Sequence, residues 1–348
     1  MKKKRVLLFT SNFMDIYKDV MESIIEKGME VVWVQASTIP NNPFRAIDKE
    51  SNKYDVDSYM TRVKTMWENR LQDEDMKEPF DFFLAINGLD VHPFIFDYFR
   101  KINPQIRMVL FLYDRVDGVM QIDGFFKYYD EVFSFDLRDT DKYKLHFLPI
   151  YWKKSTNEVP RKYDIFGFAS YSENKPERTA LYKDIKSLAD KCNLCTFIKL
   201  YISSKKGNSF IYLIKYIVKK IIGVRALPLK EIRKDLYTGK TISPAEYRCL
   251  IQQSKSILDT QASYQDGLTA RFMWALGAGK KIVTTNNSVT NYSFYNPDQF
   301  YILNENNHEG IIEFLEKDFS LSPQNRLIID QYRIDNWLNT LFQLNFKS

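Results

Sequence analysis

A short polar segment that leads into an apolar helical pattern carries residues suited to binding an anion. The run QDGLTARFMWALGAGKKIVTTN spans residues 265–286. Gly267 tolerates backbone angles barred to other residues, and Thr269 is a favoured N-cap, so a helix should begin directly after it. The amides of Gly267, Leu268 and Thr269 would then point outward at a helix N-terminus, where phosphate is stabilised. Arg271 would add a planar set of donors suited to a diphosphate.

The second part of this run predicts a tight turn and a buried strand. Gly277 and Gly279 would end the helix, and the apolar residues 281–285 would form the strand. Lys280, in the turn, is a further candidate for phosphate. The spacing matches neither GxGxxG nor a Walker A motif, and any α/β unit needs a glycine-rich turn and a capped helix. From these residues alone, phosphate binding and a purely structural turn both stay open.

Alternating strand and helix patterns must position these side chains. Apolar runs separated by helical or loop segments predict one doubly wound parallel sheet in the N-terminal half, with strands at 5–10, 30–35, 80–86, 106–113, 131–135 and 145–150. Residues 153–161, which include Ser, Thr, Asn and Pro, are typical of a linker. Beyond them the alternation resumes, with predicted strands at 163–169, 196–202, 256–259 and 281–285.

The chain is therefore predicted to contain two α/β domains. Its 348 residues suffice for two hydrophobic cores. We expect an N-terminal Rossmann-like domain over 1–152, a linker over 153–161 and a C-terminal Rossmann-like domain over 162–325. Residues 326–348 predict a C-terminal helix that could cross back to the first domain. Two such doubly wound parallel sheets with a cleft between them are typical of the GT-B glycosyltransferase fold.

Composition is that of an ordinary globular protein, 45% hydrophobic and 27% charged. The apolar run after the basic N-terminus is too short for a signal peptide, and no apolar stretch is long enough to span a membrane, so we expect a cytoplasmic protein. Three cysteines make no disulfide framework. Cys192 and Cys195 form a CxxC without the further ligands of a zinc site. Asp55 and Asp57 form an Asp-x-Asp in a polar stretch and are not flanked as in metal-dependent GT-A enzymes, so we expect no metal. No cofactor is expected either.

A basic segment over 203–235 stands out, with nine Lys and Arg residues against two acidic ones. Inside it, Lys215, Lys219 and Lys220 would lie on one side of a helix whose other side is apolar. Such a helix suits the anionic inner face of the plasma membrane, where a lipid-linked glycan would be presented. An insertion helix with solvated lysines is the alternative. Nucleic acid is not expected, because exposed stacking aromatics and a recognisable binding module are missing from the sequence.

Three regions resemble, in the same order, glycosyltransferases of bacterial capsular-polysaccharide and lipopolysaccharide biosynthesis. LFLYDRVDG at 110–118 precedes FFKYYDEVFSFDLRDTDKYKLHFLPIYW at 125–152. DIFGFASYSENKPERTALYKDI at 164–185 is similar to the strand, loop and Arg-bearing helix that begin their second half. The run at 265–286 resembles their nucleotide-sugar segment, with Gly-Leu-Thr-x-Arg, Ala-Leu-Gly-x-Gly-Lys-Lys and Thr-Thr-Asn. The resemblance covers most of residues 106–286.

The resemblance implies transfer of a sugar from a nucleotide-sugar donor, a substrate bound by the C-terminal domain, to a hydroxyl of a growing surface glycan or lipid-linked glycan on the side of the N-terminal domain. Inversion at the sugar would need a base on the acceptor hydroxyl. Asp90 and His92 follow the strand at 80–86, and Asp114 follows the strand at 106–113. Asp114 is preferred because an acid at a strand end faces the crevice of an open α/β sheet. Asp136 and Asp139 are interpreted as turn and capping residues.

One position departs from the family pattern. Many GT-B enzymes have a Glu before the Ala-Leu-Gly turn that holds the ribose hydroxyls, whereas this chain has Trp274. An indole donates one hydrogen bond and accepts none, so Asp266 or another acid would have to replace the Glu. Trp274 could equally be a core residue. A non-catalytic GT-B-like protein that binds nucleotide or glycan in an envelope-biosynthesis complex therefore stays open as the alternative function.

Overall fold

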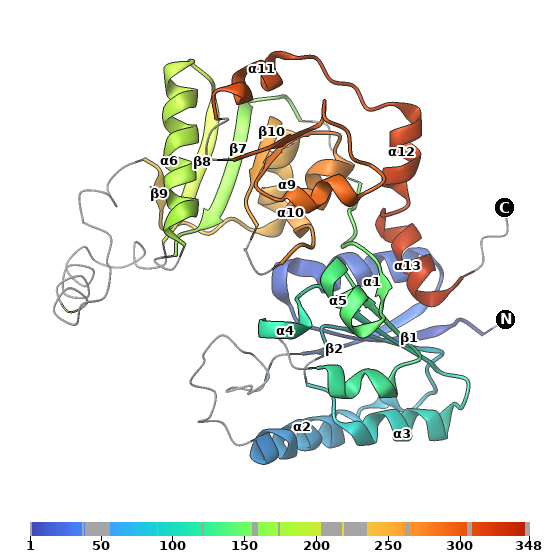
Figure 1. Cartoon of the computed structure of the whole chain (residues 1–348). Helices are drawn as coiled ribbons and strands as arrows, with labels where there is room; N and C mark the ends of the chain where they lie inside the picture. Colours follow the sequence, from blue (N-terminus) through green and yellow to red (C-terminus); the bar gives the residue numbers. More distant parts are fainter. Residues whose placement is uncertain are drawn as a thin grey trace. The chain divides into compact units, whose positions relative to one another are not determined.

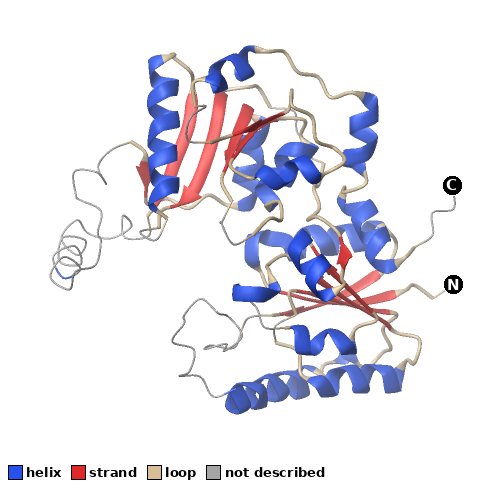
Figure 2. Ribbon diagram, viewed as in Figure 1, coloured by secondary structure: helices blue, strands red, loops and turns tan. Residues whose placement is uncertain are grey.

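The computed structural model describes residues 2–36, 38, 56–88, 90–119, 122–154, 159–172, 175–202, 218, 235–261, 265–304 and 308–344. The chain forms two compact units. The first comprises residues 1–153, 262–269 and 330–348, and the second comprises 154–261 and 270–329. Each unit is built on a parallel sheet of six strands (Figure 2). The predicted α/β class with two doubly wound sheets is thereby confirmed.

The first sheet has the strand order β2-β1-β3-β4-β5-β6. Its strands are β1 (Arg5–Thr10), β2 (Glu30–Gln35), β3 (Phe82–Ile86), β4 (Arg107–Leu112), β5 (Glu131–Ser134) and β6 (His146–Phe147). Its helices are α1 (Ile16–Glu26), α2 (Val56–Arg70), α3 (Pro93–Ile102), α4 (Val116–Val119), α5 (Leu137–Tyr143) and α13 (Ile334–Phe342), with short 3-10 turns at Phe13–Asp15, Glu74–Met76 and Asp123–Tyr128. All six residues of β1 are buried, as expected for a parallel strand covered by helices on both faces.

The second sheet has the order β12-β11-β10-β7-β8-β9. Its strands are β7 (Tyr163–Ser170), β8 (Thr196–Tyr201), β9 (Tyr237–Thr238), β10 (Ser254–Asp259), β11 (Lys281–Thr284) and β12 (Phe300–Ile302). Its helices are α6 (Pro176–Lys191), α9 (Pro244–Gln252), α10 (Ala270–Gly277), α11 (Gly310–Glu316) and α12 (Pro323–Asp330), with a 3-10 turn at Asn287–Asn291. When the strands β7 to β12 are numbered 1 to 6 in chain order, the sheet reads 3-2-1-4-5-6 from β9 to β12. This is the strand order of dinucleotide-binding Rossmann sheets.

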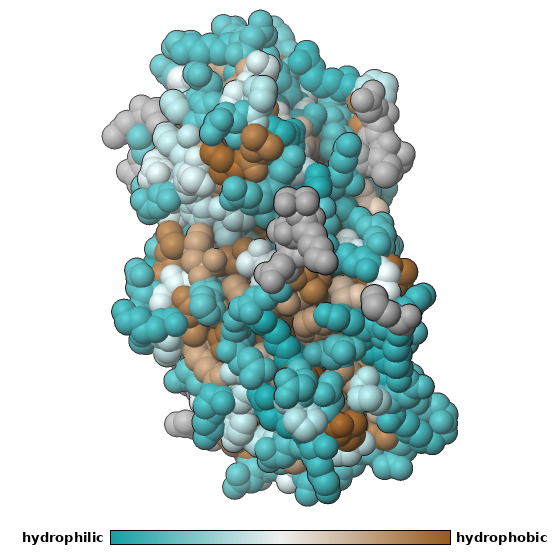
Figure 3. All heavy atoms as spheres, turned by 90° about the vertical axis from the view of Figure 1, so that its right-hand side faces the viewer, coloured by the Kyte–Doolittle hydropathy of each residue, from teal (hydrophilic) through white to brown (hydrophobic). Residues whose placement is uncertain are grey.

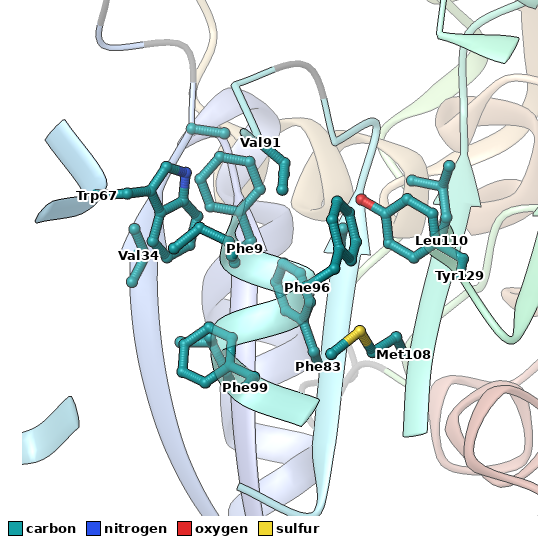
Figure 4. Close-up of a cluster of buried hydrophobic side chains, with 14 of the residues drawn as sticks. Phe9, Val34, Trp67, Phe83, Val91, Phe96, Phe99, Met108, Leu110 and Tyr129 are labelled. Carbon is teal, nitrogen blue, oxygen red and sulfur yellow. The ribbon is translucent and has the colours of Figure 1, made fainter. Parts of the chain in front are cut away.

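Aromatic side chains dominate the core of the first unit. Helices α2 and α3 cover one face of its sheet, and α1 and α13 cover the other (Figure 1). Under α2 and α3, Phe9, Trp67, Phe83 and Phe96 pack together, with the Phe9 and Trp67 ring centroids 5.1 Å apart (Figure 4). Since aromatic rings bury a large apolar area each, this cluster fixes the strand ends that carry the loops described below.

The predicted single C-terminal helix is two helices, and the second belongs to the first unit. The backbone of Trp152 accepts from the amide of Ile334 and donates to the carbonyl of Tyr332, which interrupts the helix between α12 and α13. On α13, the indole of Trp337 donates to the Pro149 carbonyl at 3.1 Å and packs edge-on against Phe111. The helical pattern is interrupted at residues 331–333 because their backbone pairs with Trp152. The spacing of apolar residues in the sequence does not predict this pairing.

Hydrophilic residues make up most of the face shown in Figure 3, and hydrophobic residues gather there in separate patches.

The predicted strand at 145–150 is reduced to the two residues of β6. Lys215, Lys219 and Lys220, predicted to contact a membrane, lie outside the described residues. Within the described part of the chain, no helix has both the length and the apolar character needed to cross a bilayer.

Candidate functional site

The run at 265–286 follows the strand at which the second sheet reverses its order. Strands β7 and β10 are neighbours, and the chain progresses outward from β7 through β8 and from β10 through β11. Ligands of open α/β sheets bind outside the carboxyl ends of the strands at such a reversal. The segment after β10 leads through residues 265–269 into α10, which begins at Ala270, directly after Thr269. Of the predicted donor segment, residues 270–286 therefore belong to the unit that contains this reversal, whereas residues 265–269 belong to the first unit.

Arg271, in the first turn of α10, is held beside a carboxylate at the end of β10. Its Nε lies 3.8 Å from Oδ1 of Asp259, and its side chain is 27% exposed. Tyr182 and Tyr247 line the same region, and burial raises the pKa of Tyr182 to about 12, so its hydroxyl stays neutral. A guanidinium held beside an almost fully buried carboxylate is pre-oriented, and its remaining donors suit an anionic ligand.

The amides at the start of the run are used inside the protein. One oxygen of the buried Asp136 carboxylate accepts from the amides of Asp266, at 2.7 Å, and Gly267, at 3.0 Å. The Asp266 carboxylate forms a two-point ion pair with the guanidinium of Arg138. In this structure the Gly267 amide is therefore not available to phosphate, and Asp266 is engaged by Arg138. The predicted phosphate donors that follow are Leu268, Thr269 and Arg271.

Gly267 is required by packing. Its φ lies outside the left-handed region, in contrast to Gly279, whose φ of 66° does need a glycine. A Cβ at position 267 would overlap the ring of Phe135, which is 2% exposed. Gly267 was predicted for its unusual backbone angles, but the reason for a glycine here is the close approach of two chain segments.

Lys280 and Trp274 both face the interior of the second unit. The Lys280 ammonium donates to the carbonyl of Gln252 at the end of α9, at 2.8 Å, and burial lowers its pKa. Trp274 is 5% exposed, meets Tyr247 edge-on and lies under the guanidinium of Arg248 at 5.1 Å. Of the two interpretations of Trp274, this is the packing of a core residue.

The first sheet also reverses its order, between β1 and β3. At the ends of β3 and β4, the side-chain amide of Asn87 donates to Asp114 at 2.9 Å, and its carbonyl oxygen accepts from the amide of Tyr113 at 2.9 Å. Asn87 itself has a φ of 60°, an uncommon conformation that is frequent at functional sites. Asp114 is thus a partly buried carboxylate, oriented at the carboxyl end of a parallel strand.

An exposed aromatic ring lies in the loop after β1. Phe13 is 58% exposed, and its ring stacks on that of Tyr113 with centroids 6.3 Å apart and planes 20° from parallel. The hydroxyls of Ser11 and Tyr113 are 3.3 Å apart. Met14 and Asp15, which follow, both have positive φ. This aromatic pair was not predicted, because Phe13 and Tyr113 lie far apart in the sequence and only the fold brings their rings together.

Asp90 and His92 have structural partners within the first unit. Asp90 is fully buried, its carboxylate accepts from the Tyr59 hydroxyl, and its carbonyl accepts from the Trp67 indole at 2.8 Å. His92 is the N-cap of α3, with its Nδ1 accepting from the amide of Phe94 at 3.3 Å. Burial lowers the His92 pKa, so the ring is neutral at pH 7. Asp114 is therefore the candidate base whose surroundings best suit contact with a ligand.

The described residues contain no group of three or more His, Cys, Asp or Glu side chains that could hold a metal ion. Cys192 and Cys195 are exposed free thiols at the end of α6 and before β8.

No family model and no sequence of a curated protein matches this chain. Solved structures match along almost its whole length at low identity. An alpha-glucosyltransferase in complex with UDP and a mismatched 13-mer DNA aligns with a TM-score of 0.50, 13% identity, and coverage of 97% of this chain and 95% of that one. AviGT4, a glycosyltransferase involved in avilamycin A biosynthesis, gives a TM-score of 0.51 with 10% identity over 98% and 97%. Alpha,alpha-trehalose 6-phosphate synthase from Burkholderia multivorans gives 0.53 with 10% identity over 98% and 97%.

Identities this low carry information about fold alone. Each of the three proteins aligns over almost the whole of this chain, which in the described residues carries two six-stranded parallel sheets with helices. The chain has a GT-B-like fold and is similar in structure to glycosyltransferases of that fold.

Proposed function

We propose that the protein is a glycosyltransferase that moves a sugar from a nucleotide-sugar donor to a hydroxyl of a growing surface glycan. The observation that carries the proposal is Arg271, which is held by Asp259 in the first turn of α10, after the strand where the second sheet reverses. Departure of a nucleotide from a sugar leaves negative charge on phosphate, which a guanidinium and helix N-terminal amides stabilise.

The donor is proposed to be a nucleoside diphosphate sugar. Leu268, Thr269 and Arg271 are neighbours in the chain at the start of α10. The Arg271 guanidinium could bind one phosphate of a diphosphate, and backbone N–H groups at the start of the helix could bind the other. Support for a uridine nucleotide comes from the structurally similar alpha-glucosyltransferase, which was solved with UDP.

The acceptor is proposed to bind the first unit, with Asp114 as the base on its hydroxyl. Asn87 fixes the orientation of this carboxylate, and the Phe13 and Tyr113 rings offer an apolar surface for the face of a sugar. The resemblance of residues 106–286 to capsule and lipopolysaccharide enzymes favours a bacterial surface glycan, presented as a lipid-linked chain at a membrane.

The test begins with thermal shift and calorimetry of the protein with UDP, GDP and CMP, followed by hydrolysis of the corresponding nucleotide sugar. Arg271→Ala should weaken binding of the preferred nucleotide at least about tenfold, the loss expected when a charge-assisted contact is removed. Arg326→Ala is the matched control, because its guanidinium contacts the Gly277 carbonyl at the other end of α10. No nucleotide binding at millimolar concentration, or equal loss in both variants, would overturn the proposal.

A non-catalytic protein that binds nucleotide or glycan in an envelope-biosynthesis complex is the second candidate. Trp274 favours it, because a buried indole occupies the helical position where a ribose-holding carboxylate would be expected. Tight nucleotide binding without hydrolysis or transfer, over a panel of sugars and with acceptor extracts supplied, would select this alternative.

A further inference from the structure

We propose that Asp136 is a positioning residue for the donor site: it fixes the loop at 265–269 from which the proposed phosphate-binding turn of α10 starts. The inference rests on the proposed function. It arises from a contact that the sequence does not suggest, because Asp136 and the loop are about 130 residues apart.

Asp136 is fully buried and divides its two oxygens between two tasks. Oδ1 accepts from the amide of Arg138 at 3.0 Å and so caps α5. Oδ2 accepts from the amides of Asp266 and Gly267 at 2.7 and 3.0 Å. Two consecutive amides donate to one oxygen of a fully buried carboxylate, and hydrogen bonds to a carboxylate are stronger than those between neutral groups. The carboxylate therefore determines the backbone path of the loop.

Two neighbours of Asp136 restrain the same loop. Arg138 pairs with the Asp266 carboxylate at two points, and the Phe135 ring leaves room for no side chain at position 267. Residues 135–138 thus contact residues 266 and 267 through a ring, a carboxylate and a guanidinium. The two residues that follow, Leu268 and Thr269, lead directly into α10. A shift of the loop would therefore displace the amides proposed to meet the donor diphosphate.

The chain contains a matched control for the charge and burial of Asp136. Asp139, on the same helix α5, is also fully buried and lies 3.5 Å from the guanidinium of Arg115. Its Oδ2 accepts from the amide of Val116 at 2.9 Å, in a different segment. Substitution of Asp139 removes a buried carboxylate of the same unit whose hydrogen bond goes to Val116 and not to the loop. Arg115 Nε also lies 3.9 Å from Oδ1 of Asp136, so this guanidinium keeps a carboxylate neighbour in the Asp139 variant.

The experiment compares Asp136→Ser, Asp136→Asn and Asp139→Asn in the full chain by amide hydrogen exchange. Serine is a good N-cap, so Asp136→Ser should preserve α5, whereas its hydroxyl is too short to reach the loop. We expect exchange at residues 265–268 to accelerate about tenfold or more in both Asp136 variants, which corresponds to about 1.4 kcal/mol of lost protection. Asp139→Asn should leave loop exchange within about twofold and accelerate exchange near Val116 instead.

A second arm measures the Kd of UDP by calorimetry for the same variants. Asp136→Ser should raise this Kd about tenfold, while Asp139→Asn stays within about twofold of wild type. Unchanged loop exchange in Asp136→Ser, or faster exchange with an unchanged Kd, overturns the inference. If wild-type protein binds neither UDP nor the other nucleotides tested, the proposed function falls and the assignment to a donor site falls with it. Hydrogen exchange still decides separately whether Asp136 fixes the loop.

Discussion

Replacement of Gly267 by alanine tests the packing on which the loop geometry depends. An ideal Cβ at this position would lie 2.9 Å from Cζ of Phe135 and closer to two further ring carbons. Carbon atoms normally approach to about 3.5–4.0 Å, so the ring or the loop has to move. Phe135 is 2% exposed and has little room to yield. Overpacking of this kind costs about 1–3 kcal/mol.

The cost of Gly267→Ala rises if the loop moves instead of the ring. The Gly267 amide donates to Asp136 at 3.0 Å, and loss of a hydrogen bond to a charged group costs about a further 1.5–3 kcal/mol. The expected destabilisation is therefore about 1–6 kcal/mol, and each kcal/mol corresponds to about 2–4 °C in Tm for a domain of this size. Urea unfolding and calorimetry measure it. Donor affinity should fall in parallel because the same displacement moves the start of α10.

The matched control is Gly124→Ala, since a Cβ at Gly124 would meet no atom within 4 Å. A double-mutant cycle adds Gly267→Ala to a Phe135→Ala background, where the clash is absent. The two substitutions should couple by about 0.5–3 kcal/mol. Equal effects of Gly267→Ala in both backgrounds, or a variant as stable as Gly124→Ala, would refute the packing argument.

Three further predictions follow from the first unit and the basic segment. His92→Asn should retain the cap on α3 and any activity. Because burial lowers the His92 pKa, the free energy of unfolding of the wild type falls as the pH drops below about 6.5, and the variant should lose this part of the pH dependence. Urea unfolding at pH 7.5 and 5.5 measures it, and the same loss of stability in both proteins would contradict the assignment. Tyr59→Phe removes the hydroxyl that donates to Asp90 and should lower the free energy of unfolding by about 1–3 kcal/mol, with unchanged turnover. Tyr98→Phe is the control. Reduced turnover in the folded Tyr59 variant would make Asp90 a catalytic candidate again. Co-sedimentation with vesicles containing anionic lipid should decrease when Lys215, Lys219 and Lys220 are changed to Glu, and equal recovery with and without acidic lipid would remove the membrane proposal.

Parallel strands and their helices were predictable because their local signals are strong. Arg5–Thr10 and Glu30–Gln35 are strands at the predicted bounds. The first is buried along its whole length, as a continuous apolar run in a parallel sheet should be. The second lies at the edge of the sheet and is mostly half-buried, and its valines still identify it as a strand. Pro176–Lys191 is a helix with proline in its first turn, a position that proline favours, so its start has a local signal. The break between α12 and α13 was not predictable, because the backbone of Trp152 causes it from a distant part of the sequence.

The residues proposed for chemistry divide in the same way. Residue type and spacing were enough to predict the α/β alternation, the anion-suited residues at 267–271 and Asp114 at a strand end. The folded structure was needed to show which of these groups already have partners. The Gly267 amide donates to Asp136, the Lys280 ammonium donates to the Gln252 carbonyl, and Trp274 lies in a core. Hydrogen-bond partners and close contacts join segments that are far apart in the chain, and a local pattern contains no record of them.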